Sequence, residues 1–325
     1  KHPAVQLLRQ GELVALPTET VYGLGADALN PDAVAKIFAA KGRPSDHPLI
    51  VHLADAGQIM TWAREVPKDA IALARAFWPG PLTLILKKDE SVPDLVTGGQ
   101  DTVGLRVPNH PVALELLRAF GSGVAAPSAN RFGRISPTTA AHVRQELGER
   151  VALILDGGAC KVGLESTIVD LSRGVPVILR PGAIGADDIA RVLGRRPRLR
   201  SEVEAGNAAE QGATPRVSGA LAAHYAPRTP LELVATDALA AQARPGDAVL
   251  ARCAAPAGLA DGVTWVQAPA DPAGYGHDLY ARLRSLDASG AARILVEAPP
   301  AAPEWAAVAD RLGRAAVGSG EDDET

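Results

Sequence analysis

Clusters of hydroxyl-bearing and cationic side chains follow short apolar runs in the first part of this sequence. The clearest cluster is "ALPTETVYGLG" at residues 15–25, where two threonines and a glutamate lie between a proline and two glycines. Proline, threonine and glycine are ordinary turn residues. Taken alone, this stretch is consistent with either an ordinary turn or a functional site. The other clusters are needed to distinguish the two interpretations.

A second cluster contains an arginine inside an apolar run. Arg106 lies in "VGLRVP" and is followed by "NHP". An arginine cannot be buried without a partner, because removing its charge from water is costly. Arg106 therefore either faces outward at an edge or joins a structural ion pair, or it acts as a fork that holds a carboxylate or phosphate.

The segment "AAKGRPSDHPLIVHL" at residues 39–53 carries two cations and two histidines: Lys41, Arg43, His47 and His52. Cations at a helix C-terminus are ordinary partners of the helix dipole, so Lys41 and Arg43 alone do not define a site. The histidines flank a predicted strand. No third histidine, cysteine or acidic residue stands at metal-ligand spacing, which disfavours a zinc site.

Two later loops combine small residues with possible ligand donors. "APSANRFG" at residues 126–133 contains Ser128 and Asn130, which could also form a simple Asx or ST turn. "DGGACKVGLESTIVD" at residues 156–170 is rich in glycine, which lets the backbone approach a ligand closely. No G-x-S-x-G sequence marks a serine nucleophile, and nothing around Cys160 marks a base that would activate its thiol.

These clusters follow predicted strands that alternate with helices, which indicates an α/β protein. Asn30, Pro31 and Gly42 predict a helix over residues 30–42, as N-cap, first-turn residue and terminating glycine. Many strands and few helices favour a large, twisted mixed sheet over a regular βαβ repeat. Further helices are predicted at 137–148 and 186–193, and strands at 13–17, 49–53, 82–87, 103–108, 123–126, 151–158, 166–172 and 176–182.

The length of 325 residues suggests two domains. We expect residues 1–198 to form the larger one and residues 199–230 a linker or lid, because 200–220 are polar and without periodicity. Residues 231–316 are expected to form a small α/β domain, and 317–325 a disordered acidic tail. In the small domain, strands are predicted near 231–235, 247–252, 262–266 and 292–298, and helices near 275–289 and 303–315.

Composition narrows the class of protein. Hydrophobic residues make up 47% and aromatic residues 4%, as in a soluble protein with an aliphatic core. The net charge of −4 does not attract a polyanion, and the basic run at 191–200 is better explained as a solvated helix end than as a nucleic-acid patch. Two distant cysteines fit a reduced, cytoplasmic setting. Neither a membrane span nor a secretory signal is visible, and a start at Lys1 leads us to expect a few preceding native residues.

Seven segments in order carry a resemblance to a known family: "PTETVYGLG", "KGRPSDHPLIVHL", "FWPGPLTLIL", "GLRVPNHP", "APSANRFGRISPT", "DGGACKVGLESTIVD" and "LRPGAI". Together they resemble the L-threonylcarbamoyladenylate synthases, over nearly all of residues 1–195. The resemblance implies a YrdC-like catalytic domain. "SGALAAHYAPRTPL" and the second domain resemble the long form of the family, which implies a smaller Rossmann-like α/β domain.

The resemblance implies a reaction in which L-threonine, bicarbonate or CO2, and ATP yield threonylcarbamoyl-adenylate and pyrophosphate. Mg²⁺ would arrive with the ATP phosphates, without a metal site in the protein and without an organic cofactor. The product would pass to a tRNA threonylcarbamoyl transferase complex, and the resemblance leaves direct tRNA binding open. Because both reactants are anionic, such a site needs cations and N–H donors more than a nucleophile.

The resemblance also assigns residues. Lys41 and Arg43 would act electrostatically in catalysis. L-threonine would be held by Thr20, His52, Arg106, Ala126 (through its backbone) and Ser166, with Arg106 on its carboxylate. ATP would be held by Lys41, Arg43, His47, Thr102, Ser128, Asn130, Ser136, Arg180 and Tyr225, the last lying over the nucleotide.

Two departures and three alternatives accompany the resemblance. His47 stands where the family usually has asparagine, which makes the site pH-sensitive, and Val217-Ser218-Gly219 replaces the usual Ser-Pro-Gly. An RNA-binding module is disfavoured by the acidic balance and the few aromatics. A hydrogenase-maturation carbamoyl transferase would need acylphosphatase and zinc-finger segments. A pure scaffold would leave the clustered polar residues unexplained.

Overall fold

The computed structural model describes residues 2–204 and 214–321, which divide into two compact units. The first unit comprises Lys1–Arg131, Pro137–Lys161 and Glu165–Ala220. The second comprises Phe132–Ser136, Val162–Leu164 and Leu221–Thr325. Two short loops, 132–136 and 162–164, thus belong to the second unit although they precede most of it in the sequence.

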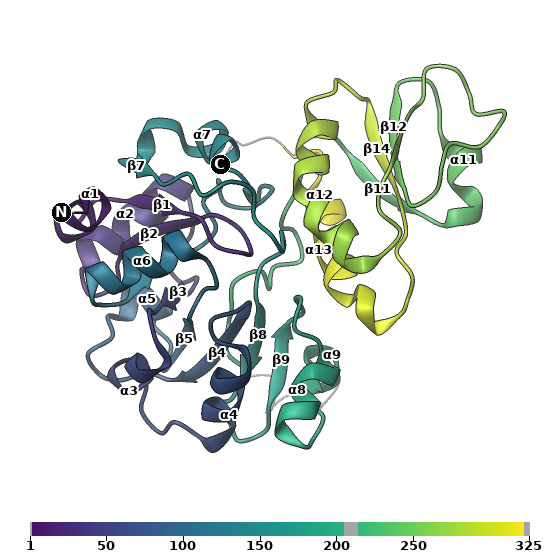
Figure 1. The fold of residues 1–325 in the computed structure, drawn as a ribbon. Helices are drawn as coiled ribbons and strands as arrows, with labels where there is room; N and C mark the ends of the chain where they lie inside the picture. Colours follow the sequence, from purple (N-terminus) through teal and green to yellow (C-terminus); the bar gives the residue numbers. More distant parts are fainter. Residues whose placement is uncertain (1, 205–213, 322–325) are drawn as a thin grey trace. The chain divides into compact units, whose positions relative to one another are not determined.

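In the described part of the first unit, ten strands form one sheet in the order β10-β9-β8-β4-β5-β3-β6-β2-β1-β7. Figure 1 shows β5, β4, β8 and β9 as neighbouring strands of this sheet. β3 runs parallel to β5 and antiparallel to β6, and β4 runs antiparallel to β5 and parallel to β8, so the predicted mixed sheet is confirmed. The strands are β1 (Val14–Leu16), β2 (Gly23–Asp27), β3 (Ile50–His52), β4 (Leu82–Lys87), β5 (Thr102–Arg106), β6 (Val124–Ala125), β7 (Leu153–Ile154), β8 (Thr167–Asp170), β9 (Val177–Arg180) and β10 (Arg198–Leu199).

Helices of the first unit outnumber those that the sequence predicted. The expected helices are present as α2 (Pro31–Lys41), α7 (Ala140–Leu147) and α8 (Ala186–Leu193). The prediction of few helices was wrong, because further helices fill the connections between strands. They are α1 (Pro3–Arg9), α3 (Ile59–Trp62), α4 (Lys68–Phe77), α5 (Asp94–Thr97), α6 (Pro111–Phe120) and α9 (Arg200–Glu204), with short 3₁₀ turns η1 (Ala56–Gln58) and η2 (Gly148–Arg150).

Both faces of this sheet are buried. Along β1, Ala15 packs in a core cluster with α2, whereas Val14 and Leu16 pack in a separate cluster with α1 and α6. This alternation follows from the opposite orientation of successive side chains in a strand. Burial on both faces explains why the strands are apolar runs rather than alternating patterns.

The sequence indicated neither the short β10 nor β2. For β2 the reason is that glycine is a poor strand former. The structure explains its composition. A Cβ on Gly25 would lie 2.9 Å from Leu16 Cδ2 of the neighbouring strand, so no larger residue fits there. Tertiary packing therefore decides the strand against local propensity.

The second unit contains a smaller parallel sheet in the order β11-β14-β12-β13 among its described residues. The strands and helices lie close to their predicted positions, which confirms a small α/β domain. Its elements are β11 (Leu231–Val234), η3 (Thr236–Ala238), α11 (Leu239–Gln242), β12 (Asp247–Ala251), β13 (Thr264–Gln267), α12 (Pro272–Asp287), β14 (Arg293–Glu297), η4 (Pro303–Trp305) and α13 (Ala306–Gly318).

The predicted linker and tail are only partly described. Residues 214–220 pack with the first unit, and α13 continues through Gly318, so the predicted tail at 317–325 begins inside a helix. Residues 205–213 of the linker and 322–325 of the tail lie outside the described residues. In the described ranges, no helix is long and apolar enough to cross a membrane.

Candidate active site

The hydroxyl cluster after β1 is ordered by a chain of hydrogen bonds. Thr18 Oγ1 donates to the carbonyl of Val21 at 2.7 Å and lies 2.9 Å from Thr20 Oγ1. Because the Thr18 hydrogen is already used, Thr20 must donate in the contact between the two hydroxyls. Thr20 Oγ1 also accepts from Nη1 of Arg106 at 3.0 Å. Towards a ligand, Thr20 can therefore only accept, which suits an amine or hydroxyl donor.

Arg106 is 3% exposed at the end of β5, so the strand carries it into the interior. Its Nε donates to the carbonyl of Gly80 at 3.1 Å, and its Nη2 forms an ion pair with the carboxylate of Glu19. The structural ion pair that was one interpretation of Arg106 is thus present. Burial, and then the nearby Arg180, lower the pKa of Arg106, whereas Glu19 opposes this shift.

The register of β3 and β5 places His52 beside Arg106. His52 is 4% exposed, and its Nδ1 lies 3.2 Å from the carbonyl of Ile50. Burial and the charge of Arg106 lower the pKa of His52 to about 3. The ring is therefore neutral at physiological pH and can take part in binding only as a neutral donor or acceptor.

Ser166, Arg180 and Thr83 form a second buried cluster in the same unit. Arg180 holds Ser166 in two ways, with Nε on its carbonyl at 2.9 Å and Nη2 on its hydroxyl at 3.1 Å. The hydroxyls of Ser166 and Thr83 lie 2.7 Å apart. The two clusters are neighbours, because Arg106 donates to the carbonyl of Gly80 and the N–H of Thr167, directly after Ser166, donates to the carbonyl of Pro81 at 3.0 Å.

Lys41 ends α2, where Gly42 terminates the helix in the left-handed conformation at φ 66°. Its Nζ donates to the carbonyls of Ser128 and Asn130, each at 2.6 Å. Burial, and then the adjacent Arg43, lower the pKa of Lys41 well below its usual range. Lys41 thus joins the helix end to the loop that the sequence marked by Ser128 and Asn130.

Arg43 and Arg180 meet at Ser218. Arg43 Nη2 donates to the carbonyl of Pro48 at 2.8 Å and to Ser218 Oγ at 3.4 Å, and Arg180 Nη1 donates to the Ser218 carbonyl at 3.4 Å. Nearby His47 has its pKa lowered by burial and by Arg43. Ser218, which lies within the predicted linker, therefore contacts two of the predicted ATP-binding residues, Arg43 and Arg180.

The structure places the other predicted residues as follows. The N–H of Ala126 is bonded to the Ile50 carbonyl at 3.1 Å, so a ligand could use only the Ala126 carbonyl. Thr102 begins β5 and lines a small cavity together with Ser218. Ser136 and Tyr225 belong to the second unit, and each is buried there.

Tyr225 packs within the second unit. Its ring is 1% exposed, stacks on Tyr280 with ring centroids 5.9 Å apart, and lies 5.5 Å from the guanidinium carbon of Arg311. Its φ of 56° is unusual for a non-glycine residue. The predicted position of this ring over a nucleotide remains a prediction.

Three residues of the site were missed by sequence reasoning: Glu19, Thr83 and Ser218. Glu19 had a usable signal, since a buried arginine requires a counter-charge and a glutamate stands in the neighbouring hydroxyl cluster. Thr83 lies in an apolar strand, where threonine is an ordinary residue, and only the sheet register brings it to Ser166.

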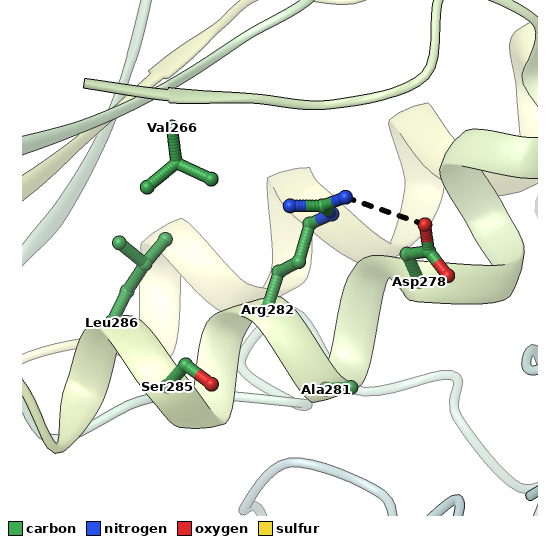
Figure 2. A pocket seen from close by; sticks show the side chains of 6 residues that line it. All are labelled: Val266, Asp278, Ala281, Arg282, Ser285 and Leu286. Atoms are coloured by element: carbon green, nitrogen blue, oxygen red, sulfur yellow. Dashed lines mark hydrogen bonds and ion pairs between the residues drawn. The ribbon is translucent and has the colours of Figure 1, made fainter.

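Other candidate features do not resemble a catalytic site. A hollow of about 320 Å³ in the second unit is lined by Val266 of β13 and by residues of α12. Figure 2 shows Arg282 turned towards Asp278, to which it is bonded at 3.4 Å. This is an ordinary ion pair along a helix surface. Burial raises the pKa of Cys160 to about 12, which disfavours a thiolate.

Arginines of the basic run at 191–200 are engaged in ion pairs. Arg195 pairs with Asp69 at 2.5 Å, Arg196 with Asp187, and Arg200 with Glu204 at 2.8 Å. Charges neutralised in this way favour the structural interpretation of the run.

Comparison with known families identifies the fold and its relatives. A family model of Sua5, YciO and YrdC proteins, described as telomere recombination, matches residues 6–182. The chain belongs to this family. A second model, described as the threonylcarbamoyl-AMP synthase C-terminal domain, matches residues 184–317. The family match covers the whole cluster from Thr20 to Arg180.

Relatives in this family are similar over much of the chain. A threonylcarbamoyl-AMP synthase of Pyrococcus abyssi is 51% identical over 191 residues, which cover 59% of this chain and 56% of the relative. One of Bacillus subtilis is 48% identical over 231 residues, which cover 71% and 65%. The matched part therefore spans less than two thirds of these relatives.

A solved structure of the family extends the match to both domains. The crystal structure of Pyrococcus abyssi Sua5 complexed with L-threonine superposes with a TM-score of 0.86 at 38% identity. The superposition covers 97% of this chain and 93% of that one.

Proposed function

We propose that this protein is an L-threonylcarbamoyladenylate synthase, which converts L-threonine, bicarbonate or CO2, and ATP into threonylcarbamoyl-AMP and pyrophosphate. One observation carries the proposal: Arg180 holds Ser166, which is assigned to threonine, and also donates to the carbonyl of Ser218, whose hydroxyl accepts from Arg43. Ser166 of the threonine set and Arg43 and Arg180 of the ATP set are therefore linked within the first unit. The similarity to the L-threonine complex of Pyrococcus abyssi Sua5 supports it.

The chemistry requires two bond-forming steps. The neutral amine of threonine attacks the carbon of CO2, or of bicarbonate with loss of water, and the amine loses a proton. A carbamate oxygen then attacks the α-phosphorus of ATP as the bond to pyrophosphate breaks. Both partners of the second step are anions, so cations that hold them together lower the barrier.

The residues divide these tasks. Arg106 has the donors for the threonine carboxylate, and Thr20 Oγ1 accepts from the amine or hydroxyl of threonine. Arg43 and Arg180 face the phosphates of ATP, which enters as its Mg²⁺ complex. Lys41, held by the carbonyls of Ser128 and Asn130, positions the nucleotide loop.

We further propose that the product serves a separate tRNA threonylcarbamoyl transferase complex. Threonylcarbamoyl-AMP is a mixed anhydride with AMP as leaving group, so an acyl-acceptor enzyme must consume it. Paired arginines in the basic run do not favour direct RNA binding as the main role.

The test is incubation with ATP, L-threonine and bicarbonate, omitting each in turn, with pyrophosphate measured and the adenylate identified by mass. We expect product only with all three. Arg43→Gln and Arg106→Gln should each lower turnover by about 100-fold or more. Arg64→Gln, which removes an exposed partner of Asp101, is the matched control and should leave turnover within twofold.

Near-normal turnover in folded Arg43→Gln and Arg106→Gln variants would contradict the proposal. Salt-dependent RNA binding without adenylate formation would instead favour an RNA-binding module of the same fold.

A further inference from the structure

Glu19 is a buried carboxylate that is paired with Arg106. It is 4% exposed, in the turn between β1 and β2. Oε1 accepts from Nη2 of Arg106, and Oε2 accepts from the backbone N–H of Asn109 at 2.8 Å. Each carboxylate oxygen therefore has a fixed partner, and the two partners lie at and just beyond the end of β5.

Arg106 has more hydrogen-bond donors than Glu19 and its other protein partners use. A guanidinium has five N–H groups, one on Nε and two on each terminal nitrogen. Among the described residues, Gly80 takes the one on Nε, Thr20 takes one on Nη1 and Glu19 takes one on Nη2. One N–H on each terminal nitrogen therefore remains, and donors on both terminal nitrogens allow a carboxylate to bind in bidentate fashion.

We infer that Glu19 is a positioning residue: it orients the Arg106 guanidinium so that the two remaining N–H groups receive the carboxylate of the amino-acid substrate. This inference rests on the proposed function. It identifies the Glu19 carboxylate as the group that sets the affinity of the protein for threonine. Glu19 connects the turn that carries Thr20 to the segment that follows Arg106. It thereby fixes the distance between the acceptor for the amine and the donors for the carboxylate.

A carboxylate is required at this position for two reasons. The charge of Glu19 offsets the cost of burying Arg106 close to a second arginine, Arg180. A glutamine has one carbonyl oxygen, which accepts, and one NH2 group, which only donates. It could therefore accept from Nη2 of Arg106 or from the N–H of Asn109 but not from both, and one of these donors would be left unpaired. The Arg106 guanidinium would then stay in the site but lose its fixed orientation.

The test compares Glu19→Gln and Glu19→Asp with Glu12→Gln, which removes an exposed partner of Lys36 in the same unit. We measure KM for L-threonine and for ATP separately, together with L-threonine affinity by calorimetry. The glutamine variant should raise KM for threonine roughly tenfold or more. The KM of the glutamine variant for ATP should stay within twofold. The KM of the aspartate variant for threonine should lie between those of the glutamine variant and the original chain. Glu12→Gln should change neither KM.

Chemical rescue keeps the inference testable if Glu19→Gln folds poorly. In Glu19→Ala, formate can occupy the vacated carboxylate site, and increasing formate should recover threonine affinity with little effect on ATP affinity. Unchanged threonine affinity in folded Glu19→Gln, or equal weakening of threonine and ATP, would overturn the inference. An original chain that neither binds threonine nor forms adenylate would instead overturn the proposed function, so the two failures are distinguishable.

Discussion

The hydroxyl groups of Thr83 and Ser166 lie 2.7 Å apart, on the neighbouring strand β4 and directly before β8. Both residues are buried. Arg180 donates to the same Ser166 hydroxyl, so Thr83 and Arg180 together orient it. Ser166 was assigned to threonine binding by resemblance, and Thr83 is the residue that aims its hydroxyl.

Replacing Thr83 by valine should therefore weaken threonine binding. The substitution keeps the shape of the side chain and removes one hydrogen bond to Ser166, so KM for threonine should rise about three- to tenfold. Steady-state kinetics with threonine varied measure this change. Thr97→Val removes a comparable buried hydroxyl that donates to the Asp94 carbonyl, and should leave KM unchanged. An equal effect in both variants would show that Thr83 acts only on stability.

Lys41 and Lys36 lie on the same helix and allow a matched comparison. Lys41 is buried on two carbonyls, whereas Lys36 is exposed and pairs with Glu12 at 3.1 Å. Lys41→Met leaves both carbonyls without their donor, so we expect kcat/KM to fall about 100-fold and stability to fall by about 1–3 kcal/mol. Lys36→Met should change stability by less than about 0.5 kcal/mol. Adenylate formation measures kcat/KM, and urea unfolding measures stability. Equal changes in the two variants would contradict a role of Lys41 in the site.

His52 should make stability depend on pH. Its pKa in the fold is about 3, below its ordinary value of 6.5, so the unfolded chain binds the proton more readily. The stabilising contribution is complete above pH 6.5 and is lost as pH falls from 6.5 towards 3, at about 1.4 kcal/mol per pH unit. Urea unfolding between pH 7 and pH 4.5 should therefore show a shallower decline in His52→Gln than in the original chain. Parallel pH profiles would contradict a buried, neutral His52.

The two cysteines should differ in reactivity. Cys160 is buried with its pKa raised to about 12, and Cys253 is exposed. Iodoacetamide at pH 8 should modify the folded protein once, at Cys253, as read by mass spectrometry. Cys253→Ser should abolish labelling. Turnover should survive alkylation, and its loss would indicate a thiol in the mechanism.

Much of the fold could be predicted because several signals are local. Asn30 and Gly42 delimit α2 through a side-chain cap and a left-handed terminus, as predicted. α6 was missed although His110 caps it and Gly121 ends it, because histidine is not one of the usual N-cap residues. β2 could not be predicted, since its Gly25 is required by packing against β1 rather than by strand propensity.

Residue types near the site were visible in the sequence, but their partners were not. Arg106 was predicted either to join a structural ion pair or to hold a ligand carboxylate or phosphate, and the structure shows an ion pair with Glu19, 87 positions away. Ser218 was discussed only as a departure from the family motif, yet it lies between Arg43 and Arg180. Such pairings depend on strand order and register, which one sequence does not state.

By itself, the sequence determined the α/β class, the caps of α2 and the set of cations and hydroxyls available for binding two anions, because each depends on residue type and short spacing. The tertiary structure alone decided which of them meet. Parallel pairing of β3 with β5 sets His52 beside Arg106, and pairing of β4 with β8 sets Thr83 beside Ser166. The physical reason is that hydrogen bonding between distant strands fixes the register, and the register fixes which side chains can touch.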